Sequence, residues 1–213
     1  VAWLRVDTQT ILTIHNHLIT KSSRFAITHS ENRTWYLHIR DVHEYDRGWY
    51  MCQINTDPMK SQVGYLDVVV PPDILDYPTS TDMVVSEGSN VTLRCEAKGY
   101  PKPHIIWRRE SGEQFHLHHG HRVSSTDGPI LIIDRVNRKD MGPYLCIASN
   151  GVPPSVSKRI MLIVNFPPSI HVANQLLGAY DGLRVVLECH SEAFPRSINY
   201  WTKDNGEIVP QST

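Results

Sequence analysis

Apolar and polar residues alternate with a period of two along much of the chain, in short runs separated by turn residues. Val91, Leu93 and Cys95, for example, alternate with polar neighbours. A stretch with two prolines, 99–103, separates this run from the next, and a helix could not cross it. Because no segment sustains the 3.6-residue period of a helix, the pattern predicts an all-β protein made of short strands.

An internal repeat of one domain length organises the sequence. Cys52 and Cys146 are 94 residues apart, and the same spacing separates Cys95 from Cys189 and also Trp107 from Trp201. The motif Asp-x-Gly-x-Tyr-x-Cys occurs at 46–52 and again at 140–146. Such self-similarity indicates tandem copies of one structural unit.

The spacing of cysteine and tryptophan within the repeat is typical of one architecture. A tryptophan follows the first cysteine by 12 residues in both copies that contain that cysteine. This Cys…Trp…Cys framework, with a tyrosine two residues before the second cysteine, predicts immunoglobulin-like β-sandwiches in tandem. We expect Cys95 and Cys146 to form a disulfide that packs against Trp107. Cys52 and Cys189 belong to other copies, so their partners should lie outside this chain.

Two Pro-Pro pairs, at 71–72 and 167–168, follow the last apolar run of a repeat and mark the expected domain boundaries. Domain 1 is then 1–70, without strands A and B; domain 2 is 71–165 and complete; domain 3 is the N-terminal part of a further domain, 166–213. Trp3 and Cys52 are 49 residues apart, against 39 for Trp107 and Cys146. The longer spacing predicts extra C′ and C″ strands, which makes domain 1 variable-type and leaves the others of the I/C2 type.

Composition and charge argue against several function classes. With 21 basic and 22 acidic residues the net charge is −1, which gives no attraction to nucleic acid or an anionic membrane surface. The apolar runs are too short to span a bilayer. We found no nucleophile, phosphate-loop or zinc-protease motif, so we expect no enzyme and no cofactor. His116, His118, His119 and His121 could form a weak metal site, but a solvated loop explains them better, and no metal site is predicted.

Four further residues are expected to form structural ion pairs, and two asparagines are expected to be glycosylated. Arg24 should pair with Asp46 and, in the next repeat, Arg122 with Asp140, both as structural ion pairs. Asn32 and Asn90 begin N-glycosylation sequons, which are credible beside a disulfide framework.

Several stretches together resemble the Dpr-interacting proteins (DIPs) of arthropods. They are 1–7, 10–12, 35–39, 48–59, 68–72 and 148–154. Lachesin is similar, and the vertebrate IgLON proteins resemble the chain more distantly. The resemblance implies three immunoglobulin domains on the outer face of the neuronal plasma membrane, held by an anchor. It also implies binding through domain 1 to Dpr-type proteins, or to a second copy in a homodimer. A secreted immunoglobulin-repeat binder is the alternative. A structural repeat of an intracellular protein fits the cysteines and sequons poorly.

Alternation indicates which side chains of domain 1 could form the binding face. Since Trp3 and Cys52 must point into the core, their neighbours should point outward. The predicted partner-binding residues are Leu4, Val6, Ile11, Thr13, Met51, Gln53 and Asn55. On the C′ strand this choice places Leu12 and Ile14 in the core. Scattered surface apolar residues are the competing interpretation.

Overall fold

The computed structural model describes residues 1–31, 33–117 and 121–210, and they form an all-β structure as predicted. Within this part of the chain the only helices are two single 3-10 turns, η1 (Glu44–Asp46) and η3 (Arg138–Asp140). The chain divides into two compact units. The first comprises Val1–Pro72 with the loops Gly99–Pro103 and Asn150–Ser155, and the second comprises the other described residues. The boundaries of the three expected domains stay a prediction.

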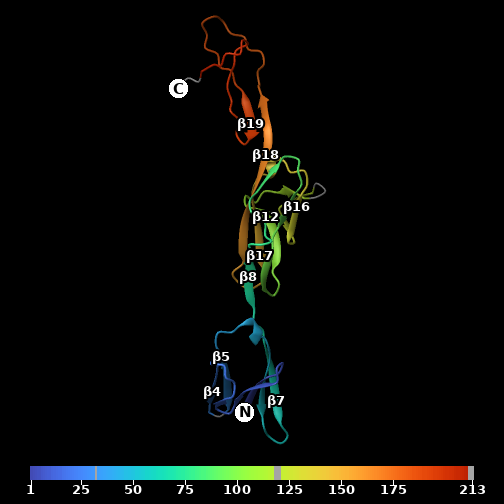
Figure 1. Ribbon diagram of the computed structural model, residues 1–213, viewed down its shortest axis with the longest axis vertical. Helices are drawn as coiled ribbons and strands as arrows, with labels where there is room; N and C mark the ends of the chain where they lie inside the picture. Colours follow the sequence, from blue (N-terminus) through green and yellow to red (C-terminus); the bar gives the residue numbers. More distant parts are fainter. Residues whose placement is uncertain (32, 118–120, 211–213) are drawn as a thin grey trace. The chain divides into compact units, whose positions relative to one another are not determined.

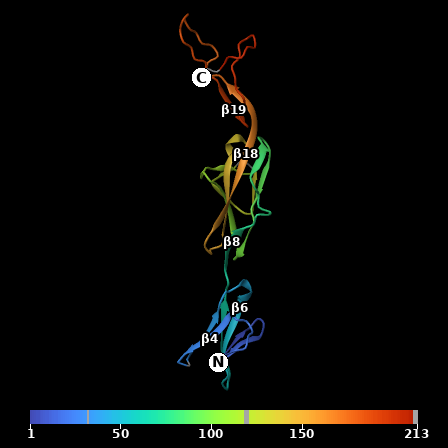
Figure 2. The same ribbon diagram turned by 60° about the vertical axis from the view of Figure 1, so that its left-hand side comes forward.

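The first unit has two layers (Figures 1 and 2). One is an antiparallel sheet in the order β3-β2-β1-β6-β7, and the other is the hairpin β4–β5. Their apolar inner faces enclose a small core of Leu12, Phe25 and Tyr50. The strands β2 and β3 extend the sheet where C′ and C″ were expected. The bounds are β1 (Ala2–Arg5), β2 (Thr10–Ile14), β3 (His17–Leu18), β4 (Phe25–Ser30), β5 (Thr34–Ile39), β6 (Gly48–Ile54) and β7 (Lys60–Leu66).

The second unit is built on a sheet in the order β15-β12-β17-β18-β19, to which β9 adds by parallel pairing with β18. The pair β10–β16 forms a separate sheet, and β13–β14 is a shorter pair. The strands β8 and β11 pair with each other, and each has residues in both units. The bounds are β8 (Val70–Ile74), β9 (Met83–Ser86), β10 (Val91–Arg94), β11 (Ala97–Tyr100), β12 (His104–Arg109), β13 (Phe115–His116), β14 (Arg122–Val123), β15 (Ser125–Asp127), β16 (Ile130–Ile133), β17 (Gly142–Ser149), β18 (Val156–His171) and β19 (His190–Phe194).

The core of the second unit confirms the cysteine and tryptophan prediction. Cys95 and Cys146 form a disulfide, and Trp107, which is fully buried, lies directly opposite Cys146 in the β12–β17 register. Alternate residues of β10, β16 and β17 point inward and complete a core of 15 buried residues. Cys52 and Cys189 are free cysteines, as expected for residues without a partner in this chain.

Both copies of the Asp-x-Gly-x-Tyr-x-Cys motif form the same hydrogen-bonded corner. The hydroxyl of Tyr50 donates to the carbonyl of Asp46 (2.8 Å), and that of Tyr144 donates to the carbonyl of Asp140 (3.0 Å). Each tyrosine therefore fixes the 3-10 turn that precedes its strand, β6 or β17.

Candidate protein-binding face

The outer surface of the five-stranded sheet of the first unit carries an apolar row across four neighbouring strands. Leu4 on β1 lies opposite Ile11 on β2 and opposite Met51 on β6, and Met51 lies opposite Val63 on β7. Ile11 and Val63 are 42% and 53% exposed, so the row is open to solvent. Residues opposite each other in a sheet point to the same side, which makes this row one continuous apolar strip.

A second, aromatic row flanks the strip. Trp49 on β6 lies opposite Tyr65 on β7, and their rings meet edge to face at 5.1 Å between centroids. Val6, just after β1, donates its backbone N–H to the carbonyl of Trp49 (2.9 Å). About half of each aromatic side chain is exposed. Large rings with an apolar body and a polar tip are the residues that most often anchor protein interfaces.

The start of β6, which carries Trp49, depends on the close approach of the Asp7 side chain to the backbone at Gly48. The Asp7 carboxylate accepts the backbone N–H of Trp49 (3.1 Å). At Gly48 a Cβ atom would lie 1.9 Å from this carboxylate, and φ there is +147°. Glycine is therefore required at position 48 both for its backbone conformation and to admit Asp7.

Amide groups lie on the other flank of the strip, at the end of β6. Gln53 Nε2 donates to Asn55 Oδ1 (2.9 Å) and to Met59 Sδ (2.8 Å). This network holds the Gln53 side chain in one orientation. Its Oε1 has no hydrogen-bond donor among the described residues and can accept a bond from a partner.

The structure places most of the predicted residues on this surface. Leu4, Ile11, Met51 and Gln53 point outward from the sheet, while Val6 and Asn55 lie just beyond the ends of β1 and β6.

The prediction for Thr13 is wrong, because its side chain is fully buried, and Ile14, predicted to be buried, is 42% exposed. The cause is a β-bulge. Trp3 lies opposite Thr13 and Leu4 lies opposite Ile11, so Leu12 is an extra residue without a partner on β1. A bulge shifts the alternation by one residue, which turns Leu12 and Thr13 inward together.

Sequence reasoning missed Trp49, Val63 and Tyr65. Trp49 has the same parity as Met51, so alternation along β6 would have found it. Val63 and Tyr65 lie on β7, a mostly polar strand whose pairing with β6 the sequence pattern does not predict.

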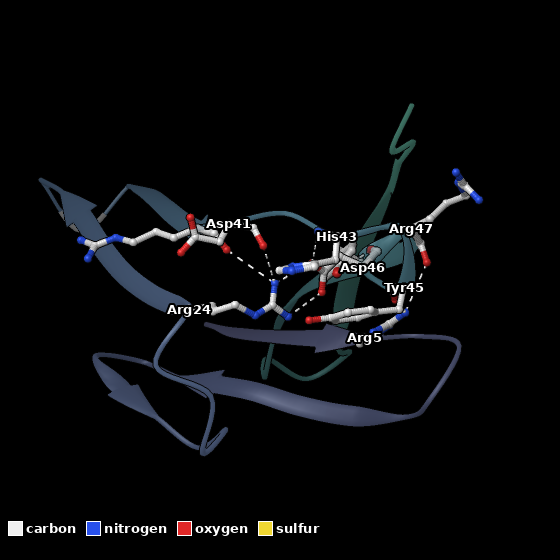
Figure 3. A network of polar contacts seen from close by, with 9 residues as sticks. Arg5, Arg24, Asp41, His43, Tyr45, Asp46 and Arg47 are labelled. Carbon is white, nitrogen blue, oxygen red and sulfur yellow. Dashed lines mark hydrogen bonds and ion pairs between the residues drawn. The ribbon is translucent and has the colours of Figure 1, made fainter. Parts of the chain in front are cut away.

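The end of the first unit that contains η1 is held by an ion pair between the partly exposed Arg24 and the buried Asp46, which Figure 3 shows in detail. The Arg24 guanidinium donates to both carboxylate oxygens of Asp46, at 2.6 and 2.8 Å, and also to the carbonyl of Asp41 (3.1 Å). The backbone N–H of His43 donates to the same carboxylate (2.8 Å). The bonds from Arg24, supported by that from His43, hold the pKa of Asp46 below its ordinary value, against the opposing effect of burial. This confirms the first predicted ion pair.

We expect Asp46→Asn to lower the local unfolding free energy at β6 by about 2 kcal/mol at neutral pH, because charge-assisted bonds to a buried carboxylate are lost. Because the pKa of Asp46 is lowered in the folded state, its charge stabilises the fold fully at pH values above the unfolded-state pKa of about 3.9. This stabilisation is lost as the pH falls through the folded-state pKa. Hydrogen exchange of peptides from β6, measured at several pH values and corrected for intrinsic rates, checks this. The difference in amide protection between the variant and the parent should disappear in acid. Asp67→Asn is the control, since Asp67 is half exposed in its pair with Arg47; equal effects of the two variants would contradict the assignment.

The second predicted pair, Arg122 with Asp140, is wrong. His116 on β13 occupies the expected place, with Nδ1 3.6 Å from the Asp140 carboxylate. Arg122 lies opposite His116 on β14 and donates from Nε to His116 Nε2 (3.0 Å). The arginine is thus one strand too far from the carboxylate, and the histidine lies between them.

The other sequence-based candidates have the following outcomes. The described residues contain no group of three or more potential metal ligands, and His118 and His119 lie outside them. Asn32 also lies outside the described residues, whereas Asn90 is exposed at the start of β10. Among the described residues no helix is long and apolar enough to cross a membrane.

Comparison with known proteins identifies the family. An immunoglobulin-domain model matches residues 71–150. The chain is 36% identical to lachesin of Schistocerca americana, over 96% of this chain and 59% of lachesin. It is 37% identical to the limbic system-associated membrane protein of Rattus norvegicus, over 81% of this chain and 48% of that protein. The chain therefore spans about half to three-fifths of the length of these relatives.

Two crystal structures extend the similarity to three dimensions. A chain in the complex of Dpr2 Ig1-Ig2 with DIP-Theta Ig1-Ig3 is 66% identical, with a TM-score of 0.84, over 99% of this chain and 71% of that one. DIP-gamma IG1+IG2 is 47% identical, with a TM-score of 0.65, over 76% of this chain and 81% of that one. The chain therefore belongs to the immunoglobulin-domain family of the DIP and lachesin proteins.

Proposed function

We propose that this chain is part of a cell-surface adhesion and recognition protein that binds Dpr-type immunoglobulin domains through the outer surface of its five-stranded sheet. The observation that carries the proposal is the exposed apolar strip of Leu4, Ile11, Met51 and Val63. Two similar proteins support the partner class, since DIP-Theta and DIP-gamma were crystallised in complex with Dpr2 and Dpr11.

The chemistry of the surface suits association between two sheets. Its centre is apolar, Trp49 and Tyr65 lie along one side, and Gln53 provides an oriented amide on the other. Apolar centres with aromatic anchors and a few hydrogen bonds at the edge are typical of specific interfaces. Of the partner-binding residues predicted from sequence, Leu4, Val6, Ile11, Met51, Gln53 and Asn55 remain in the proposed face, to which we add Ile14, Trp49, Val63 and Tyr65.

A homodimer through the same surface is the second candidate. None of the face residues carries a charge, so two copies could meet without repulsion between like charges. A two-fold axis through such a sheet would place the apolar strip of each copy on that of the other.

An extracellular location and a role in binding rather than catalysis complete the proposal. The Cys95–Cys146 disulfide fits an oxidising compartment. A relative is named as a membrane protein, and we propose that an anchor outside this chain holds the protein at the outer face of the neuronal plasma membrane.

Surface plasmon resonance against immobilised first domains of Dpr proteins tests the partner class, and oxidative footprinting of the complex tests the face. We expect saturable binding and protection of Met51 and Trp49 from oxidation. Tyr36 is the control, because it is about half exposed on β5, in the other layer. Binding that leaves Met51 and Trp49 unprotected would refute the face. Failure to bind any Dpr domain would refute the partner class, and sedimentation would then show whether the chain pairs with itself.

A further inference from the structure

We propose that Asn90 carries an N-linked glycan and that this glycan covers an apolar patch on the outer side of β10 and β16. The proposal rests on the extracellular location proposed above, because N-glycans are added in the secretory pathway. The sequon Asn90-Val91-Thr92 lies at the start of β10, in the unit that does not contain the candidate binding face.

The side chain of Asn90 is suited to accept a glycan. It is exposed, and its Oδ1 accepts the backbone N–H of Arg135 (3.0 Å). The glycan bonds to the other atom of the amide, Nδ2, which has no hydrogen-bond partner among the described residues. The oxygen thus holds the side chain in place while the nitrogen stays available for the modification.

The strand directs the modification away from the core. Val91 is 1% exposed and packs inward, so Asn90 and Thr92 lie on the outer side of β10. The threonine hydroxyl that the sequon requires is therefore on the same side as the acceptor asparagine.

An apolar pair lies beside this acceptor. Thr92 is directly opposite Ile132, and Arg94 is opposite Ile130. The two isoleucines are 41% and 44% exposed, on the outer face of a two-stranded sheet. Asn90 and Thr92 are about 7 Å apart along the strand, within reach of the first sugars of a glycan.

Covering this pair would have a physical benefit. Sugar rings have apolar faces that pack on aliphatic side chains, and an exposed apolar sheet face otherwise promotes association. With the β10–β16 face covered, this face would not compete with the exposed apolar strip of the first unit for a partner.

Peptide mapping of the full-length protein, secreted from insect cells and treated with an N-glycanase, tests occupancy. Conversion of Asn90 to aspartate by the enzyme is the expected result. Thr92→Ala should abolish it while leaving the Asn90–Arg135 contact intact, and Thr92→Ser should preserve it, because serine also completes a sequon. An unmodified Asn90 in the parent protein would overturn the proposal.

Sedimentation of the same secreted proteins, without N-glycanase treatment, tests the covering role. Thr92→Ala should self-associate several-fold more strongly than Thr92→Ser, and adding Ile132→Thr to Thr92→Ala should reverse the difference. Equal association of the alanine and serine variants would overturn this part. Dpr binding measured in parallel separates the two proposals: binding with an unmodified Asn90 refutes only the glycan, and an occupied Asn90 without binding refutes only the partner.

Discussion

Ile11→Asp should weaken binding of a Dpr-type partner on the order of 1,000-fold, about 4 kcal/mol. Ile11 lies at one end of the exposed apolar strip, directly opposite Leu4, and the strip contains no lysine or arginine. A carboxylate placed there would be removed from water on binding without a cation to pair with, which is among the most unfavourable changes at an interface. The free domain should be unaffected, because the Ile11 side chain is already 42% exposed.

Surface plasmon resonance with matched variants checks this result. Val6→Asp, on the aromatic flank, should also weaken binding strongly, whereas Tyr36→Asp on β5 introduces the same charge into the other layer and should leave affinity within a few-fold of the parent. If Ile11→Asp and Val6→Asp both bind like Tyr36→Asp, the proposed face is wrong.

The candidate face shows how far alternation alone leads. Along β1 and β6 the hydrogen-bonded register is regular, so the inward positions of Trp3 and Cys52 correctly determined that Leu4 and Met51 point outward. On β2 the same reasoning placed Leu12 correctly in the core but failed at Thr13 and Ile14, because a bulge at Leu12 inserts one residue and reverses the parity beyond it. The run 11–14 contains apolar residues of both parities, so its pattern gives no indication of where the bulge lies.

The motif at 46–52 and 140–146 shows the same limit for polar contacts. The tyrosine hydroxyl bond to the aspartate carbonyl recurs in both copies, because it needs only residues within the motif. The side chain that meets the aspartate comes from outside the motif, and its identity depends on how the neighbouring strands pair. Arg24 fills the role in the first unit and His116 fills it in the second. The spacing of residues within the motif is the same in both copies, so it does not determine which side chain from outside the motif meets the aspartate.

Replacing both Cys95 and Cys146 with alanine should lower the unfolding free energy of the second unit by about 4 kcal/mol. The bridge closes a loop between residues 51 positions apart, and the loss of this constraint on the unfolded chain accounts for a destabilisation of that size. For a domain of roughly 100 residues the melting temperature should fall by about 15 to 30 °C. Both sulfurs are also buried in the core with Trp107, so the smaller alanines leave space that adds to the effect.

The two free cysteines provide the matched control for this experiment. Cys52→Ser and Cys189→Ser also remove a thiol each, but neither breaks a bridge in this chain. Cys189 is exposed, so Cys189→Ser in particular should leave the transition of the second unit unchanged in differential scanning calorimetry. Addition of a reductant to the parent protein should reproduce the shift of the double alanine variant, because the disulfide is then the shared cause. If the transition of the double variant stays within a few degrees of the parent's, the stability of this unit comes from its buried apolar residues alone, and the bridge does not contribute the expected free energy.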